Sequence, residues 1–128
     1  MDDSGKLVKR DELLAVEGRN SFKALLREQG DEIRRDVLMI LRPEESHSGR
    51  LESGITIVYP GCRTNGHSHA DREEVYFFLE GRGVMGVGDE EWEVKTGDTF
   101  YVHPGPFHTT SNPHETPLKF FWITIKID

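Results

Sequence analysis

Turn signals recur at short intervals from residue 53 onward, and this spacing restricts the fold more than any other feature of the chain. Between the turns lie short runs rich in Val, Ile, Phe, Tyr and Thr, the residue types favoured in strands. Glycine and aspartate at positions 81, 88–89 and 97–98 suit tight hairpins. The sequence therefore predicts an all-β fold with strands at about Asp36–Arg42, Gly54–Tyr59, Gly66–His69, Glu74–Glu80, Gly83–Val87, Glu91–Val94, Thr99–Val102, His108–Asn112 and Leu118–Ile127.

The first third of the chain has a less regular pattern. Asp11–Glu17 could form a short helix with Asp11 as its N-cap, whereas Asn20–Glu28 fits a helix or a strand equally well. A length of 128 residues suits one domain. We expect residues 1–53 to be an N-terminal extension with edge strands or a short helix, in the same domain as the body formed by residues 54–128.

The net charge of −7 argues against nucleic acid as a partner, because phosphates require a basic surface. Cys62 is the single cysteine, so an intramolecular disulfide is excluded and a reducing compartment is the simplest inference. The polar start does not resemble a signal peptide, and no run approaches the ~18 apolar residues of a membrane span. We expect a cytoplasmic protein that binds neither nucleic acid nor membranes.

Three histidines and one glutamate stand at spacings that suit a metal site. In a strand, His67 and His69 point to the same side, about 7 Å apart, and can converge on one ion. Glu74 follows after a gap long enough for a turn and heads a strand that has apolar side chains on both faces, which suggests that the strand is covered on both sides. A buried carboxylate needs a partner, which a cation would supply. His108 brings a third imidazole.

This donor set selects among metals. Three neutral imidazoles and one carboxylate suit Mn, Fe, Co, Ni, Cu or Zn, and they do not suit Ca or Mg, which prefer oxygen ligands. Four protein ligands around a six-coordinate ion leave two positions for substrate or water. The sequence therefore predicts one divalent transition metal ion held by His67, His69, Glu74 and His108.

The same residues carry a resemblance to a known family. Nine positions at the expected spacing resemble the two cupin motifs, namely Gly61, His67, His69, Glu74 and Gly81 for the first and Gly97, Gly105, His108 and Asn112 for the second. One position departs, because His103 stands where the second motif has proline. The resemblance implies a double-stranded β-helix (jelly-roll) barrel over residues 54–128, with a metal among its strands and often a homodimeric assembly.

The side chains that share faces with these ligands are pocket candidates. Tyr76 follows Glu74 on the same face, so its phenol is the candidate catalytic proton donor. The remaining expected pocket residues are Tyr59, Phe78, Met85, His103, Thr110, Asn112 and Trp122. Four arginines, at positions 42, 50, 63 and 72, could meet an anionic substrate, but balancing the 23 acidic residues on the surface is the favoured interpretation.

The cupin barrel serves many functions, so the fold leaves several open. By analogy with small cupins, we favour a metal-dependent isomerase or epimerase acting on a sugar or sugar acid. An Fe(II) dioxygenase and a non-catalytic, metal-stabilised module that binds a small ligand are the alternatives. We also expect a homodimer, with residues 20–42 contributing to its interface.

Overall fold

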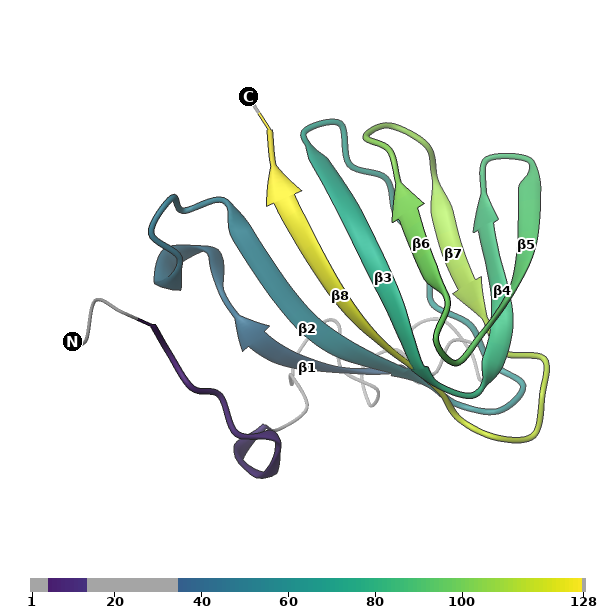
Figure 1. Cartoon of the computed structure of the whole chain (residues 1–128). Helices are drawn as coiled ribbons and strands as arrows, with labels where there is room; N and C mark the ends of the chain where they lie inside the picture. The colour runs from purple at the N-terminus through teal and green to yellow at the C-terminus, as the bar shows by residue number, and fades with distance from the viewer. Residues whose placement is uncertain (1–4, 14–34, 128) are drawn as a thin grey trace.

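The computed structural model describes residues 5–13 and 35–127, and within them the fold is all-β. The elements are two 3₁₀ turns, η1 (Arg10–Glu12) and η2 (Pro43–Glu45), and eight strands: β1 (Arg35–Leu41), β2 (Leu51–Val58), β3 (Arg72–Glu80), β4 (Arg82–Val87), β5 (Glu90–Lys95), β6 (Thr99–Val102), β7 (His108–Ser111) and β8 (Leu118–Lys126). The strands form a five-stranded sheet, ordered β1-β2-β8-β3-β6, and a three-stranded sheet, ordered β5-β4-β7 (Figure 1). All neighbours are antiparallel, which confirms the predicted jelly-roll class.

Glycines shape the hairpins where the sequence predicts turns. Gly81, between β3 and β4, has a φ of 87°, a conformation in which other residues are strained. A Cβ at this position would lie 2.3 Å from the carbonyl oxygen of Pro117, so no larger side chain fits. Gly88 and Gly97 also have positive φ, in the turns after β4 and β5. These turns set the strand boundaries because they reverse the chain within a few residues.

The predicted strand at Gly66–His69 is wrong. The segment between β2 and β3 runs beside β7 but makes only isolated bridges, Arg63 with Ser111 and His67 with His108. Between the two bridges, residues 64–66 of the segment lie opposite only residues 109–110 of β7. Gly66 has a φ of 75°, which interrupts an extended backbone. His67 and His69 therefore lie in a loop that is hydrogen-bonded to the edge of β7.

Within the described residues, the helix expected at Asp11–Glu17 is only a short 3₁₀ turn. The 3₁₀ turn η1 ends at Glu12, and Leu13 is already extended with a ψ of 129°. Residues 14–17 and the ambiguous segment Asn20–Glu28 lie outside the described residues. Further on, β1 pairs with β2, so residues 35–41 belong to the five-stranded sheet.

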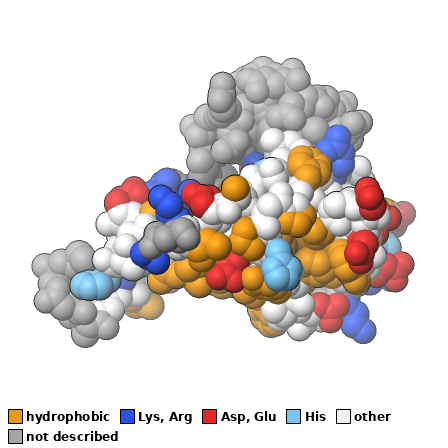
Figure 2. All heavy atoms as spheres, turned by 90° about the horizontal axis from the view of Figure 1, so that it is seen from above, with side chains coloured by type: hydrophobic (Ala, Val, Ile, Leu, Met, Phe, Trp, Pro, Cys, Tyr) orange, Lys and Arg blue, Asp and Glu red, His pale blue; other side chains and the backbone are white. Residues whose placement is uncertain are grey.

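The core lies between the two sheets and takes alternate residues of each strand. On β3, Glu74, Tyr76 and Phe78 point inward and are at most 4% exposed. Val75, Phe77 and Leu79 point outward and are 37–42% exposed, so within the described residues this strand is covered on one face only, contrary to expectation. Hydrophobic side chains reach the surface as a broad band in Figure 2.

Among the described helical segments, none has the length and apolar character needed to span a membrane.

Candidate metal centre

Both sheets and the loop between β2 and β3 contribute to one cluster of potential metal ligands. Glu74 comes from β3 in the larger sheet and His108 begins β7 in the smaller one. The loop supplies His67 and His69. Its backbone is held to β7 because the N–H of His67 donates to the carbonyl of His108 at 3.1 Å, and the N–H of His108 donates back at 2.9 Å. The amide of Gly105 donates to the carbonyl of His69 at 2.6 Å, which positions the second histidine.

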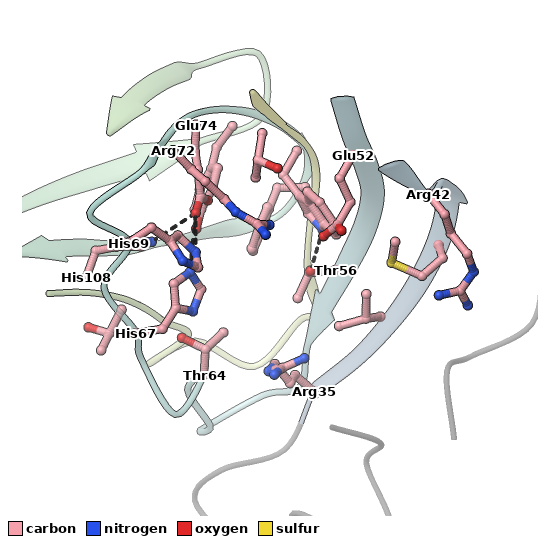
Figure 3. Close-up of a pocket in the computed structure, with 17 residues that line it drawn as sticks. Arg35, Arg42, Glu52, Thr56, Thr64, His67, His69, Arg72, Glu74 and His108 are labelled. Atoms are coloured by element: carbon pink, nitrogen blue, oxygen red, sulfur yellow. Dashed lines mark hydrogen bonds and ion pairs between the residues drawn. The ribbon is translucent and has the colours of Figure 1, made fainter. Parts of the chain in front are cut away.

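The four side chains meet around one carboxylate oxygen, as Figure 3 shows. Oε1 of Glu74 lies 2.9 Å from Nε2 of His69 and 3.4 Å from Nε2 of His67. Nε2 of His108 lies 3.5 Å from the same oxygen. All four potential ligand atoms lie within 4.8 Å of one another. The residues that the sequence singles out are therefore brought to one point.

His108 gives the clearest sign that a cation belongs in this cluster. Its Nδ1 lies 3.2 Å from the carbonyl oxygen of Pro106, which only accepts hydrogen bonds, so Nδ1 carries the proton. Nε2 then presents a lone pair, and this buried atom has no hydrogen-bond partner among the described residues. A lone pair facing a carboxylate oxygen at 3.5 Å is unfavourable unless a positive charge lies between them. The donor set thus fits a transition metal ion.

The electrostatics keep the ligands in the forms that bind metals. Burial alone would raise the pKa of Glu74, but interactions with the rings of His108 and His67, when these rings carry a proton at Nε2, outweigh it and hold the pKa below its usual range. Burial and the neighbouring His67 lower the pKa of His69, which favours the neutral ring. Burial, followed by the Glu74 carboxylate, raises the pKa of Tyr76 well above the usual value, so the phenol stays protonated.

The cluster opens onto a cavity of about 360 Å³, a size that suits a small molecule. Its lining comes from the inner faces of β1, β2, β3 and β8 together with the ligand segments: Arg35, Val37, Met39, Arg42, Glu52, Thr56, Thr64, His67, His69, Arg72, Glu74, Tyr76, His108, Thr109, Phe120, Trp122 and Thr124. Three arginines and two glutamates give this lining a charged character.

The cavity includes two of the eight non-ligand site candidates, Tyr76 and Trp122. Tyr76 stacks on Phe120 with ring centroids 4.7 Å apart, and the indole N–H of Trp122 donates to the hydroxyl of Thr56 at 2.9 Å. Phe78 and Met85 are fully buried in the core, away from the lining. Both lie deeper in the barrel, and alternation along a strand predicts the face of a residue but not its depth.

The other candidates also lie away from the cavity lining. Thr110 is buried and its hydroxyl donates to the Met85 sulfur at 3.1 Å. The amide of Asn112 donates to the carbonyls of Val58 and Thr116, so it ties the loop after β7 to β2. Tyr59 donates to the Asp36 carboxylate at 2.5 Å. His103 is exposed and packs edge-on against Tyr101, with ring centroids 4.9 Å apart.

Six polar lining residues were not predicted from the sequence, namely Arg35, Glu52, Thr56, Thr64, Thr109 and Thr124. Of the four arginines considered, Arg42 and Arg72 line the cavity, whereas Arg50 and Arg63 are not in the lining. Alternation on β2 places Glu52 and Thr56 on the inner face with Val58, so part of this lining was detectable once the strand was assigned. No pattern marks Arg35, because β1 lies outside both motifs.

The chain is similar in sequence to several known proteins. An uncharacterized protein of Methanocaldococcus jannaschii is 46% identical over 63 residues, covering 49% of this chain and 50% of its own length. The glucose-6-phosphate isomerase of Thermococcus gammatolerans is 34% identical over 116 residues, covering 80% of this chain and 59% of that enzyme. The chain therefore spans about half the length of the curated relatives it matches.

A solved structure shares the fold over nearly the whole chain. A predicted oxalate decarboxylase from Thermotoga maritima superimposes with a TM-score of 0.79 at 22% sequence identity, covering 95% of this chain and 100% of that one. At this identity the likeness shows the fold alone. Residues 54–124, from β2 to β8, match the cupin domain family. The family match covers more than half of the chain, and the motif histidines and Glu74 meet at one centre of the barrel, so the chain belongs to the cupin family.

Proposed function

We propose that this cupin is a metal-dependent isomerase acting on a small sugar-type metabolite. The observation that carries the proposal is the cluster of three histidines and Glu74, with its unpartnered buried nitrogen, at one end of a 360 Å³ cavity. The similarity to glucose-6-phosphate isomerase over 80% of the chain supports the reaction class.

The described residues suggest a division of roles. His67, His69, Glu74 and His108 would hold a divalent transition metal ion, which would supply Lewis-acid stabilisation of negative charge on a substrate oxygen. Tyr76 lies in the same lining beside Glu74 and offers a hydroxyl for hydrogen bonding or proton donation. Phe120 and Trp122 form an apolar wall that can cover the carbon skeleton of a sugar.

The test combines elemental analysis with an isomerase assay. Protein purified without added metal is analysed for bound elements, and the protein reloaded with Mn, Fe, Co, Ni or Zn is assayed for aldose–ketose interconversion. We expect one equivalent of metal and turnover that falls by at least 100-fold in His108→Ala. His47→Ala, an exposed histidine outside the cluster, is the matched control and keeps full activity.

The other functions predict different results in the same assay. A dioxygenase consumes oxygen with bound iron and stops under anaerobic conditions. A ligand-binding module turns over nothing with any metal, although sugars raise its melting temperature. Either result excludes the isomerase.

We also propose that the chain forms a homodimer. The support is the outward face of β3, where Val75, Phe77 and Leu79 remain 37–42% exposed, because exposed apolar faces of this kind are usually covered by a partner. Light scattering at micromolar concentration is expected to give twice the chain mass, and Phe77→Glu is expected to reduce it to one chain. A wild-type mass of one chain contradicts the proposal.

A further inference from the structure

We propose that Arg35 and Arg72 form a subsite for an anionic oxygen group of the ligand, a phosphoryl or carboxylate group, whose other end faces the metal cluster. That one end of the ligand reacts at the metal cluster rests on the proposed function. That its other end is anionic is argued from the cavity lining alone.

Arg35 carries a guanidinium whose charge is costly to bury. It points from the start of β1 into the cavity, and burial is the main cause that lowers the pKa of its side chain. Its one hydrogen-bond partner among the described residues is the side-chain oxygen of Asn65, at a long 3.5 Å. A desolvated cation with so weak a partner gains more from a bound anion than an exposed surface arginine does.

Arg72 approaches the cavity from the start of β3, opposite Arg35 in Figure 3, and its side chain is 33% exposed. Its ion pair with Asp71 is loose, with 3.8 Å between Nε and Oδ1. The planar fork of a guanidinium matches a phosphoryl or carboxylate group with two parallel hydrogen bonds. Each of the two arginines therefore has donors left for a ligand.

Two threonines add donors to the same lining. The hydroxyl of Thr56 accepts the indole N–H of Trp122 at 2.9 Å, and the hydroxyl of Thr64 accepts the backbone N–H of Thr110 at 3.1 Å. Because each oxygen already accepts a hydrogen bond from the protein, its own proton is available to donate into the cavity. The subsite is thus richer in donors than in acceptors.

The charge balance of the cavity supports an anion. Its lining holds three arginines against Glu52 and Glu74, and the Glu74 carboxylate faces the three imidazoles. The whole chain carries a net charge of −7, so the excess of arginines in the cavity lining differs from the acidic composition of the protein as a whole. In Figure 3, Arg42 lies at the far end from the histidines, and Arg35 and Arg72 flank the space between. A ligand in that space can meet both arginines and the metal cluster.

The experiment measures binding affinity rather than the rate of turnover. D-glucose 6-phosphate, D-gluconate and neutral D-glucose are titrated by calorimetry into the Mn²⁺-loaded full chain and into Arg35→Gln and Arg72→Gln. We expect at least one anionic sugar to bind tenfold or more tightly than glucose. Each substitution should weaken that binding at least tenfold and leave the affinity for glucose within about twofold. The better of the two anionic probes identifies the group as phosphoryl or carboxylate.

Arg82→Gln is the matched control, because Arg82 lies on β4 outside the cavity and contacts His114 at 3.5 Å. It should change none of the affinities, and circular dichroism melts of all variants check that they fold. Equal affinities for charged and neutral sugars overturn the subsite, as does an unchanged affinity in both cavity variants. If the binding pattern holds without isomerisation, the subsite stands and the proposed reaction fails. If isomerisation proceeds with an unchanged KM in both variants, the reaction stands and the subsite fails.

Discussion

Substituting Asn112 by alanine separates a structural role from a role in ligand binding. The side chain is 1% exposed and its amide donates to the carbonyls of Val58 at 3.0 Å and Thr116 at 2.8 Å. Its oxygen accepts the backbone N–H of His114 at 3.1 Å. Asn112→Ala therefore removes three hydrogen bonds and leaves polar groups without partners.

Each of these hydrogen bonds contributes about 1 kcal/mol, and a buried carbonyl left unpaired adds a further cost. We expect the free energy of unfolding to fall by about 3 kcal/mol, which lowers the melting temperature by roughly 10 °C in a domain of this size. Guanidinium unfolding checks this, with a lower midpoint and an unchanged m value.

Two further variants sharpen the measurement. Asn112→Asp keeps the acceptor for His114 but loses both donors and turns a carboxylate toward two carbonyl oxygens, so it should cost at least as much. Asn65→Ala, the matched control, loses one contact of 3.5 Å and should change stability by less than about 0.5 kcal/mol. A loss below 1 kcal/mol in Asn112→Ala, or a loss of metal binding at full stability, refutes the reasoning.

Three further perturbations have definite expected outcomes. His108→Ala should reduce the metal content from one equivalent to almost none by elemental analysis, because it removes the buried nitrogen; retained stoichiometry contradicts this role. Tyr59→Phe loses the hydrogen bond to Asp36 and should destabilise the fold by about 1 kcal/mol in urea at pH 7. Burial and this hydrogen bond raise the pKa of Tyr59 to about 12, so the difference from wild type should persist below pH 10 and shrink as pH rises through 12. Gly81→Ala should cost more than about 2 kcal/mol, since its Cβ would collide with backbone, whereas Gly88→Ala has open space and should cost about 1; equal losses contradict the steric argument.

The sequence allowed the strands and the ligands to be predicted because both depend on short-range patterns. β6 has the predicted bounds, and most other strands differ by one to three residues at an end. The cluster of three histidines and Glu74 was predictable because these residues keep their sequence spacing even where the expected strand is a loop, as at His67 and His69.

The cavity was harder to predict because it depends on depth and on distant strands. Phe78 and Asn112 share faces with Glu74 and His108, yet one fills the core and the other binds backbone carbonyls. Arg35 reaches the cavity only because β1 pairs with β2, in a register that sets Arg35 opposite Val58. Local periodicity carries no information about such a pairing.

Glu74 and His108 belong to different sheets, and His67 and His69 lie in the loop between β2 and β3, which is bridged to β7 of the smaller sheet. Any ion held there is therefore a cross-link between the two sheets, in addition to their apolar packing and the hydrogen bond from Asn112 to Val58. By thermodynamic linkage, its binding free energy adds to the free energy of unfolding. Chelation should thus speed amide exchange in β3 and β7 together, although these strands are not hydrogen-bonded neighbours.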